Sequence, residues 1–195
     1  KFPCHEGSLH RELASLELLL QKVKGEDVPV VFTVFSPATT ADKLSGKKML
    51  SHIRSGHGEM VKKALEIITE TTMEVAAEAI RLGADGIFFA SQMSSYDTMT
   101  AEEYMEYGRP YDLRVLDAAG DGWLNTLHAH GNNIMFEVLK DYPVSVFNWH
   151  AWETLPDLDE AFCLTGKCLM GGLQRMDITN RNKNAIQHQI FESFK

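Results

Sequence analysis

Short apolar runs alternate with longer segments of helical periodicity along the whole chain, and this alternation constrains the fold more than any other feature. The run at 28–35 is apolar and rich in β-branched residues, as expected for a strand buried on both faces. The expected strands are residues 28–35, 84–90, 123–128, 144–148 and 167–171. Helices are expected at 9–23, 39–44, 59–82, 100–118 with an interruption near Pro110, 132–140, 157–164 and 179–194. Such alternation predicts an α/β fold with parallel strands and right-handed crossovers.

Alternation alone leaves two architectures open, an open doubly wound sheet and part of a (β/α) barrel. No Gly-x-Gly-x-x-Gly segment follows the first expected strand. A dinucleotide-binding Rossmann domain therefore loses its main support.

Length and composition narrow the class of protein. The 195 residues, 44% of them apolar, are enough for one domain with a buried core. A net charge of −8 argues against a nucleic-acid partner, and no apolar run is long enough to span a membrane. The three cysteines, Cys4, Cys163 and Cys168, form no Cys-x-x-Cys pair, which favours a reduced, cytoplasmic setting. We expect Cys163 and Cys168 to be buried small apolar residues.

Six segments, mostly at the ends of the expected strands, extend in order over nearly the whole chain. They are 32–37 (FTVFSP) with 41–46 (ADKLSG), 83–92 (GADGIFFASQ), 102–104 (EEY) with 109–111 (RPY), 127–131 (LHAHG), 148–149 (NW) and 170–175 (MGGLQR). In register, they resemble the uroporphyrinogen decarboxylase superfamily, which includes the decarboxylase of haem biosynthesis and zinc-dependent cobalamin and coenzyme M methyltransferases.

The resemblance implies a TIM-type (β/α)8 barrel in which the five expected strands are the third to the seventh. A closed barrel has eight strands and typically about 250 residues. We therefore expect residues 1–195 to form a single domain that is a partial barrel. Its open edges, at 28–35 and 167–171, are expected to cause self-association or to hold the remainder of the barrel.

Barrels of this type carry their chemistry at the carboxyl ends of the strands. The polar residues expected there are Ser36, Ser91, Gln92, His128, His130, Asn148, His150, Gln174 and Arg175. Five different loops contribute to this set. We expect Ser36, Gln92, His128, His130, Asn148 and Arg175 to lie on one face and line one cavity. The expected substrate-binding residues are Ser36, Lys43, Ser91, Gln92, Asn148 and Arg175.

His128 and His130 are the candidate metal ligands. Residues two apart on a strand point to the same side, and imidazole is a common zinc ligand. Two hydrogen-bonded histidines at a strand end are the simpler alternative. The resembling methyltransferases have His-x-Cys-Gly at this place, whereas the present sequence has His130 where they have cysteine.

Lys43 and Arg175 are the cations expected near the barrel mouth, where they would suit an acidic ligand of the tetrapyrrole class. The resembling decarboxylases have a tyrosine near the position of Lys43, and none stands here. Catalytic residues cannot be assigned from the sequence.

Three functions follow from the resemblance. The first is decarboxylation of uroporphyrinogen acetate side chains, which needs no added cofactor. The second is zinc-dependent transfer of a methyl group between a corrinoid and a thiol. The third is a catalytically inactive barrel fragment that pairs with another chain.

Overall fold

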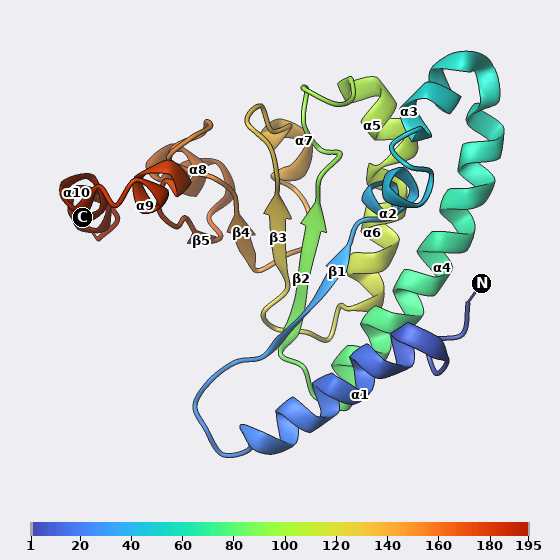
Figure 1. Cartoon of the computed structure of the whole chain (residues 1–195), viewed down its shortest axis with the longest axis horizontal. Helices are drawn as coiled ribbons and strands as arrows, with labels where there is room; N and C mark the ends of the chain where they lie inside the picture. Colours follow the sequence, from blue (N-terminus) through green and yellow to red (C-terminus); the bar gives the residue numbers. More distant parts are fainter. Residues whose placement is uncertain (1, 195) are drawn as a thin grey trace.

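A single parallel sheet is the centre of the fold in the computed structural model, which describes residues 2–194 (Figure 1). Its strands are β1 Val31–Phe35, β2 Gly86–Ser91, β3 Thr126–Ala129, β4 Val146–Asn148 and β5 Cys168–Met170. The helices are α1 Gly7–Lys22, α2 Pro37–Leu44, α3 Met49–His52, the π-helical turn η1 Ile53–His57, α4 Gly58–Leu82, α5 Ala101–Tyr107, α6 Arg109–Ala118, α7 Phe136–Leu139, α8 Leu158–Thr165, α9 Arg175–Thr179 and α10 Lys183–Glu192.

The strand order decides between the two expected architectures. Each strand pairs in parallel with the next strand in the chain, giving the order β1-β2-β3-β4-β5. A doubly wound sheet reverses its strand order at a switch point, whereas a barrel adds every strand beside the preceding one. The fold is therefore a partial TIM-type barrel, with β1 and β5 as its open edges.

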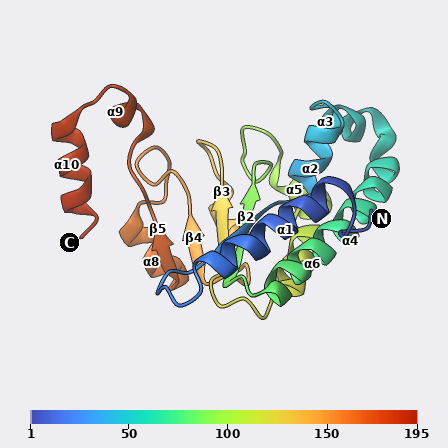
Figure 2. The same cartoon turned by 60° about the horizontal axis from the view of Figure 1, so that its bottom comes forward.

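The helical layer covers one face of the sheet. Side chains of the middle strands that point to this face, such as Phe89, Leu127 and Phe147, are fully buried. Helix α4 packs on β1, β2 and α6, and α8 packs on β5. The sheet curves, with these helices on its outer side (Figures 1 and 2). The core thus lies between the sheet and the helices.

The opposite face of the sheet would be the interior of a closed barrel. The register places Phe35, Ala90, His128, Asn148 and Met170 in one row across this face. Its two ends are open, because Phe35 is 40% and Met170 45% exposed. The polar residues of this row therefore face outward from the core, toward the barrel axis.

Two expected helices differ from the structure. Of residues 132–140, only Phe136–Leu139 form α7, because Asn133 and Ile134 bond to the loop after β2 through a bridge to Ser95 and a hydrogen bond from the Tyr96 N–H. The last helix, expected at 179–194, is divided into α9 and α10. Arg181, between them, has a φ of 56°, which an α-helix cannot accommodate.

The expectation that Cys163 and Cys168 are buried was wrong. Both are exposed, whereas Cys4 is buried. Cys168 begins the edge strand β5, whose flank is open, and Cys163 lies on the outer side of α8.

Helices α9 and α10 project beyond β5, away from the rest of the sheet (Figures 1 and 2). The side chain of Gln189 joins them, since its amide donates to Asp177 and its carbonyl accepts from the Gln174 N–H. None of the helices among residues 2–194 has the length and apolar character needed to cross a bilayer.

Candidate metal centre

Three histidines from two neighbouring strand ends converge at the carboxyl edge of the sheet. His128 belongs to β3, His130 follows that strand, and His150 follows β4. One ring nitrogen from each residue lies within 4.8 Å of the other two. His150 Nε2 and His130 Nδ1 are 3.4 Å apart. All three side chains are only partly exposed.

The orientation of His128 is fixed by a hydrogen-bond relay. Asn148 Nδ2 donates to the carbonyl oxygen of Met170 at 2.5 Å, so its Oδ1 points the other way, toward His128 Nδ1 at 2.6 Å. This arrangement places the proton of a neutral His128 on Nδ1 and leaves the lone pair on Nε2. Phe88 stacks on the His128 ring at 5.4 Å between centroids.

Burial shifts two of the imidazoles toward the neutral form. Removal from water lowers the pKa of His128, more than its hydrogen bond to Asn148 raises it. Burial and then the nearby positive charge of Arg175 lower the pKa of His150. A neutral imidazole is the form that binds metal, so these two residues are ready as ligands at neutral pH.

Ser36 and Ser91 have structural roles in the fold. Both are fully buried. The Ser36 hydroxyl caps α2 by accepting from the Thr39 N–H and donating to the Thr39 hydroxyl. The Ser91 hydroxyl lies 3.2 Å from the Tyr104 hydroxyl, on the helical side of the sheet. Neither hydroxyl points toward the histidines.

The remaining predicted residues are spread along the rim. Gln92 is partly exposed, and its backbone N–H donates to Thr39. Lys43 places its ammonium 5.0 Å from the centroid of the Phe35 ring, at the β1 edge. Arg175 is at the same end of the sheet as the histidines, in a bidentate ion pair with Glu153. Lys43 and Arg175 therefore each interact with a side chain of the protein itself, Phe35 and Glu153 respectively.

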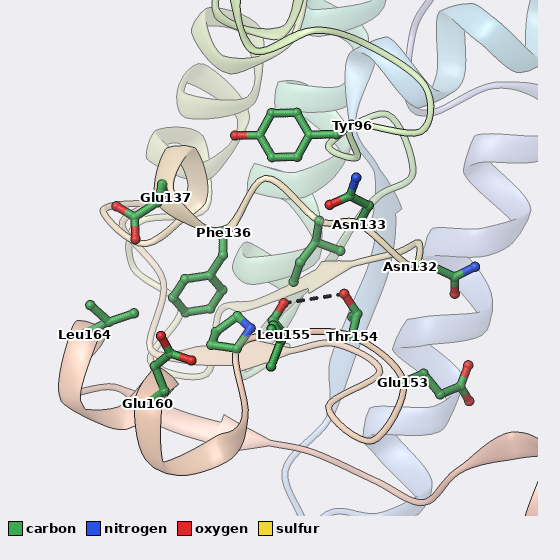
Figure 3. Close-up of a pocket in the computed structure, with 12 residues that line it drawn as sticks. Tyr96, Asn132, Asn133, Phe136, Glu137, Glu153, Thr154, Leu155, Glu160 and Leu164 are labelled. Carbon is green, nitrogen blue, oxygen red and sulfur yellow. Dashed lines mark hydrogen bonds between the residues drawn. The ribbon is translucent and has the colours of Figure 1, made fainter.

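A pocket of about 460 Å³ lies beside the histidine loops (Figure 3). The loops after β2, β3 and β4 supply Tyr96, Asn132, Asn133 and Glu153, and α8 supplies Glu160 and Leu164. Two of these lining residues are close in sequence to the histidines: Asn132 follows His130 by two residues, and Glu153 follows His150 by three. Glu153, which pairs with Arg175, is part of the pocket wall.

His150 is the residue that sequence reasoning placed on the rim but did not assign as a ligand. The register between β3 and β4, which the structure supplies, indicates that His150 lies beside His130. His128 pairs with Asn148 across the sheet, so His130 and His150 occupy equivalent positions beyond the two strands. Spacing within one strand cannot show this relation.

The donor set fits a metal such as zinc, because three imidazoles converge and the site lies at a partly open sheet edge. Enzymes built on (β/α) barrels carry their chemistry at the carboxyl ends of the strands, and the histidine cluster lies at that place.

The chain belongs to the uroporphyrinogen decarboxylase family, since the family model "Uroporphyrinogen decarboxylase (URO-D)" matches residues 3–195. Two curated relatives are named methylcobamide:CoM methyltransferase MtbA. The protein of Methanosarcina acetivorans is 25% identical over 132 residues, which are 67% of this chain and 38% of the relative. That of Methanosarcina mazei is 25% identical over 127 residues, which are 65% and 37% of the respective chains.

A solved structure of a methyltransferase from Methanosarcina mazei has the same fold. It aligns with a TM-score of 0.74 and 22% identity, covering 87% of this chain and 50% of the other. The chain thus spans less than two-fifths of the length of the curated relatives it matches. The family is enzymatic, and the expected superfamily and barrel fold are confirmed.

Proposed function

We propose that this chain carries the metal-binding part of a methyltransferase site, in which a methyl group passes between a corrinoid and a thiol. The observation that carries the proposal is the convergence of His128, His130 and His150 at the strand ends. The names of the curated relatives, methylcobamide:CoM methyltransferases, supply the reaction class.

The protein's own residues position the ligand set. Asn148 holds the His128 ring through Nδ1, and Phe88 covers one face of that ring. The His130 backbone N–H donates to the Ser91 carbonyl oxygen at 2.9 Å, which fixes the start of its loop to β2. A bound zinc ion would supply a Lewis acid that lowers the pKa of a thiol and so provides a thiolate at neutral pH.

In the proposed reaction, a sulfur–methyl bond forms as the cobalt–methyl bond of the corrinoid breaks, and the electron pair of that bond stays on cobalt. All three imidazoles are partly exposed, so a ligand can reach them from solvent. The proposed ligands are therefore a thiol held close to His128 and His130 and a corrinoid above the strand ends.

Decarboxylation of a uroporphyrinogen, our first expectation from the sequence, receives less support. That substrate carries several carboxylates, which need free cations in the site. Arg175 is paired with Glu153, and Lys43 lies against Phe35 at the far edge of the sheet. The curated relatives above are named as methyltransferases.

The test is methyl transfer from methylcobalamin to coenzyme M by the zinc-loaded chain, followed by the change in corrinoid absorbance. We expect His128→Ala and His130→Ala to abolish transfer, and His10→Ala, an exposed histidine on α1, to leave it unchanged. A zinc-loaded wild-type chain without transfer would refute the methyltransferase proposal. A wild-type chain that binds no zinc and transfers no methyl group would favour the third function, an inactive barrel fragment.

A further inference from the structure

His150 is the least expected member of the histidine cluster. It comes from a different strand than His128 and His130, and its Nε2 lies 3.4 Å from His130 Nδ1. The three rings are 5.3 to 5.7 Å apart between centroids and are turned edge-on or tilted to one another. The rings therefore do not stack, and one ring nitrogen of each lies within 4.8 Å of the other two.

The separation of His150 Nε2 and His130 Nδ1 agrees with tetrahedral coordination. Two imidazole nitrogens bound to one zinc at about 2.0–2.1 Å in a tetrahedral arrangement lie about 3.3–3.4 Å apart. His150 and His130 have this separation already. The other pairs are within 4.8 Å, and rotation of the side chains about their torsions can close that difference.

The hydrogen bond to Asn148 orients His128 as a ligand. Because Asn148 accepts from His128 Nδ1, only Nε2 of His128 carries a free lone pair. Metal-binding histidines characteristically donate their second ring N–H to a carbonyl or carboxylate oxygen. The Asn148 side-chain carbonyl has this role here, and Met170 of β5 in turn fixes Asn148.

We infer that the centre is a three-imidazole zinc site, with His128, His130 and His150 as ligands and Asn148 as a positioning residue. The inference rests on the proposed function for the location and identity of the metal. It adds His150 as a ligand and a donor set made only of nitrogen atoms. Among the described residues, the cluster includes no cysteine.

The donor set has a chemical consequence. Three neutral imidazoles leave the full double positive charge on the metal, whereas thiolate ligands would neutralise part of it. The fourth position of such a site is open to an exchangeable ligand. The ligand class it favours is therefore a small anion that binds through one atom, with a thiolate as the member relevant to methyl transfer.

The experiment measures metal binding directly on the chain, independently of activity. Zinc affinity is determined by competition with a chromogenic chelator, and the donor set is determined from the absorption spectrum after Co²⁺ substitution. We expect the wild-type chain to bind zinc stoichiometrically. The cobalt form should show the visible bands of four-coordinate Co²⁺ without a sulfur-to-cobalt charge-transfer band.

Two substitutions test the assigned roles. His150→Ala should lower zinc affinity by about 100-fold or more and change the cobalt bands, while His10→Ala should do neither. Asn148→Leu should lower affinity by about 10–100-fold, as is typical for residues that orient a ligand. Asn148→Asp, which keeps the acceptor for His128 Nδ1 but loses the donor to the Met170 carbonyl, should lower it less than Asn148→Leu does. Circular dichroism shows whether each variant is folded, and His150→Asn replaces His150→Ala if the latter is not.

The outcomes separate the two proposals. Unchanged zinc affinity and cobalt spectrum in folded His150→Ala or His150→Asn would overturn the inference but leave His128 and His130 as ligands. A charge-transfer band would overturn the all-nitrogen donor set. If all binding results are as expected and methyl transfer is absent, the three-imidazole site stands and the methyltransferase proposal fails.

Discussion

A buried carboxyl group behind the site gives the sharpest prediction about stability. Asp112 of α6 is fully buried, and its Oδ2 accepts hydrogen bonds from the hydroxyls of Tyr104 at 2.5 Å and Tyr142 at 3.0 Å. Its Oδ1 has no hydrogen-bond partner among the described residues. Burial raises the pKa of Asp112 from 3.8 to about 7, although the two hydroxyls act in the opposite direction.

The direction of the pH effect follows from linkage. The folded protein holds the Asp112 proton more tightly than the unfolded chain does. The contribution of Asp112 to the free energy of unfolding is therefore fully present below the unfolded pKa of 3.8 and is lost as the pH rises toward about 7. At 1.36 kcal/mol per pKa unit, the full loss is about 4 kcal/mol. Between about pH 5 and about pH 8, the expected part of that loss is about 2.5 kcal/mol.

Asp112→Asn removes this titration while keeping the shape of the side chain. Its amide oxygen can still accept from Tyr104 and Tyr142. We expect urea denaturation to show that the free energy of unfolding of the variant, relative to wild type, rises by about 2.5 kcal/mol from about pH 5 to about pH 8. Asp117→Asn, an exposed position on the same helix, is the matched control and should show no such change.

A difference between Asp112→Asn and wild type that stays constant over this pH range would refute the reasoning. It would mean that Asp112 is ionised in the folded protein throughout, with the two tyrosine hydroxyls compensating its burial. Equal pH dependence in the Asp117→Asn control would likewise show that the effect does not arise from the buried carboxyl group.

Three further predictions concern the core, a helix start and the open sheet. Asn125→Ala should destabilise the fold by about 1–3 kcal/mol, as measured by urea denaturation, because the Ile87 N–H loses its acceptor while the Ala119 carbonyl keeps the hydrogen bond from the Gly122 N–H. Thr100→Ala removes the capping box of α5 and should cost about 1 kcal/mol in the same assay. Light scattering of the 195-residue chain should give a mass above 21.9 kDa, because two strand edges and one sheet face are open; a stable monomer would contradict this.

Local sequence patterns were sufficient for the kinds and order of the main elements. The long helix predicted at 59–82 matches α4, and Gly83 ends it with a φ of 113°. The Thr-x-x-Glu spacing of Thr100 and Glu103 is typical of a capping box, and the structure has one there. These features depend on interactions within a few residues, so one sequence contains the information for them.

Features that depend on contacts between distant segments were not predictable. Residues 132–135 have helical periodicity, but their backbone bonds to the loop after β2 instead. Ser36 and Ser91 stand at strand ends, yet each hydroxyl is directed into the core by a partner on a helix or helix start. Polar character alone does not reveal to which side such a residue points.

The candidate site was predictable in part. The pair His128 and His130 followed from the alternation of side chains along one strand. The contribution of His150 required the register between β3 and β4, which only the structure supplies. The engagement of Arg175 by Glu153 depends on the loop after β4 and has no counterpart in the local pattern.

The sequential strand order also bears on how the chain can acquire its structure during synthesis. Every strand pairs with the one made just before it, so no strand must wait for a distant segment. Pairing between successive units keeps the closed loops short, and this lowers the entropy cost of each step. The sheet can therefore grow from β1 toward β5 as the chain leaves the ribosome. The histidine cluster would assemble only after β4 has joined β3, and the relay that orients His128 would be completed last, when β5 brings the Met170 carbonyl to Asn148.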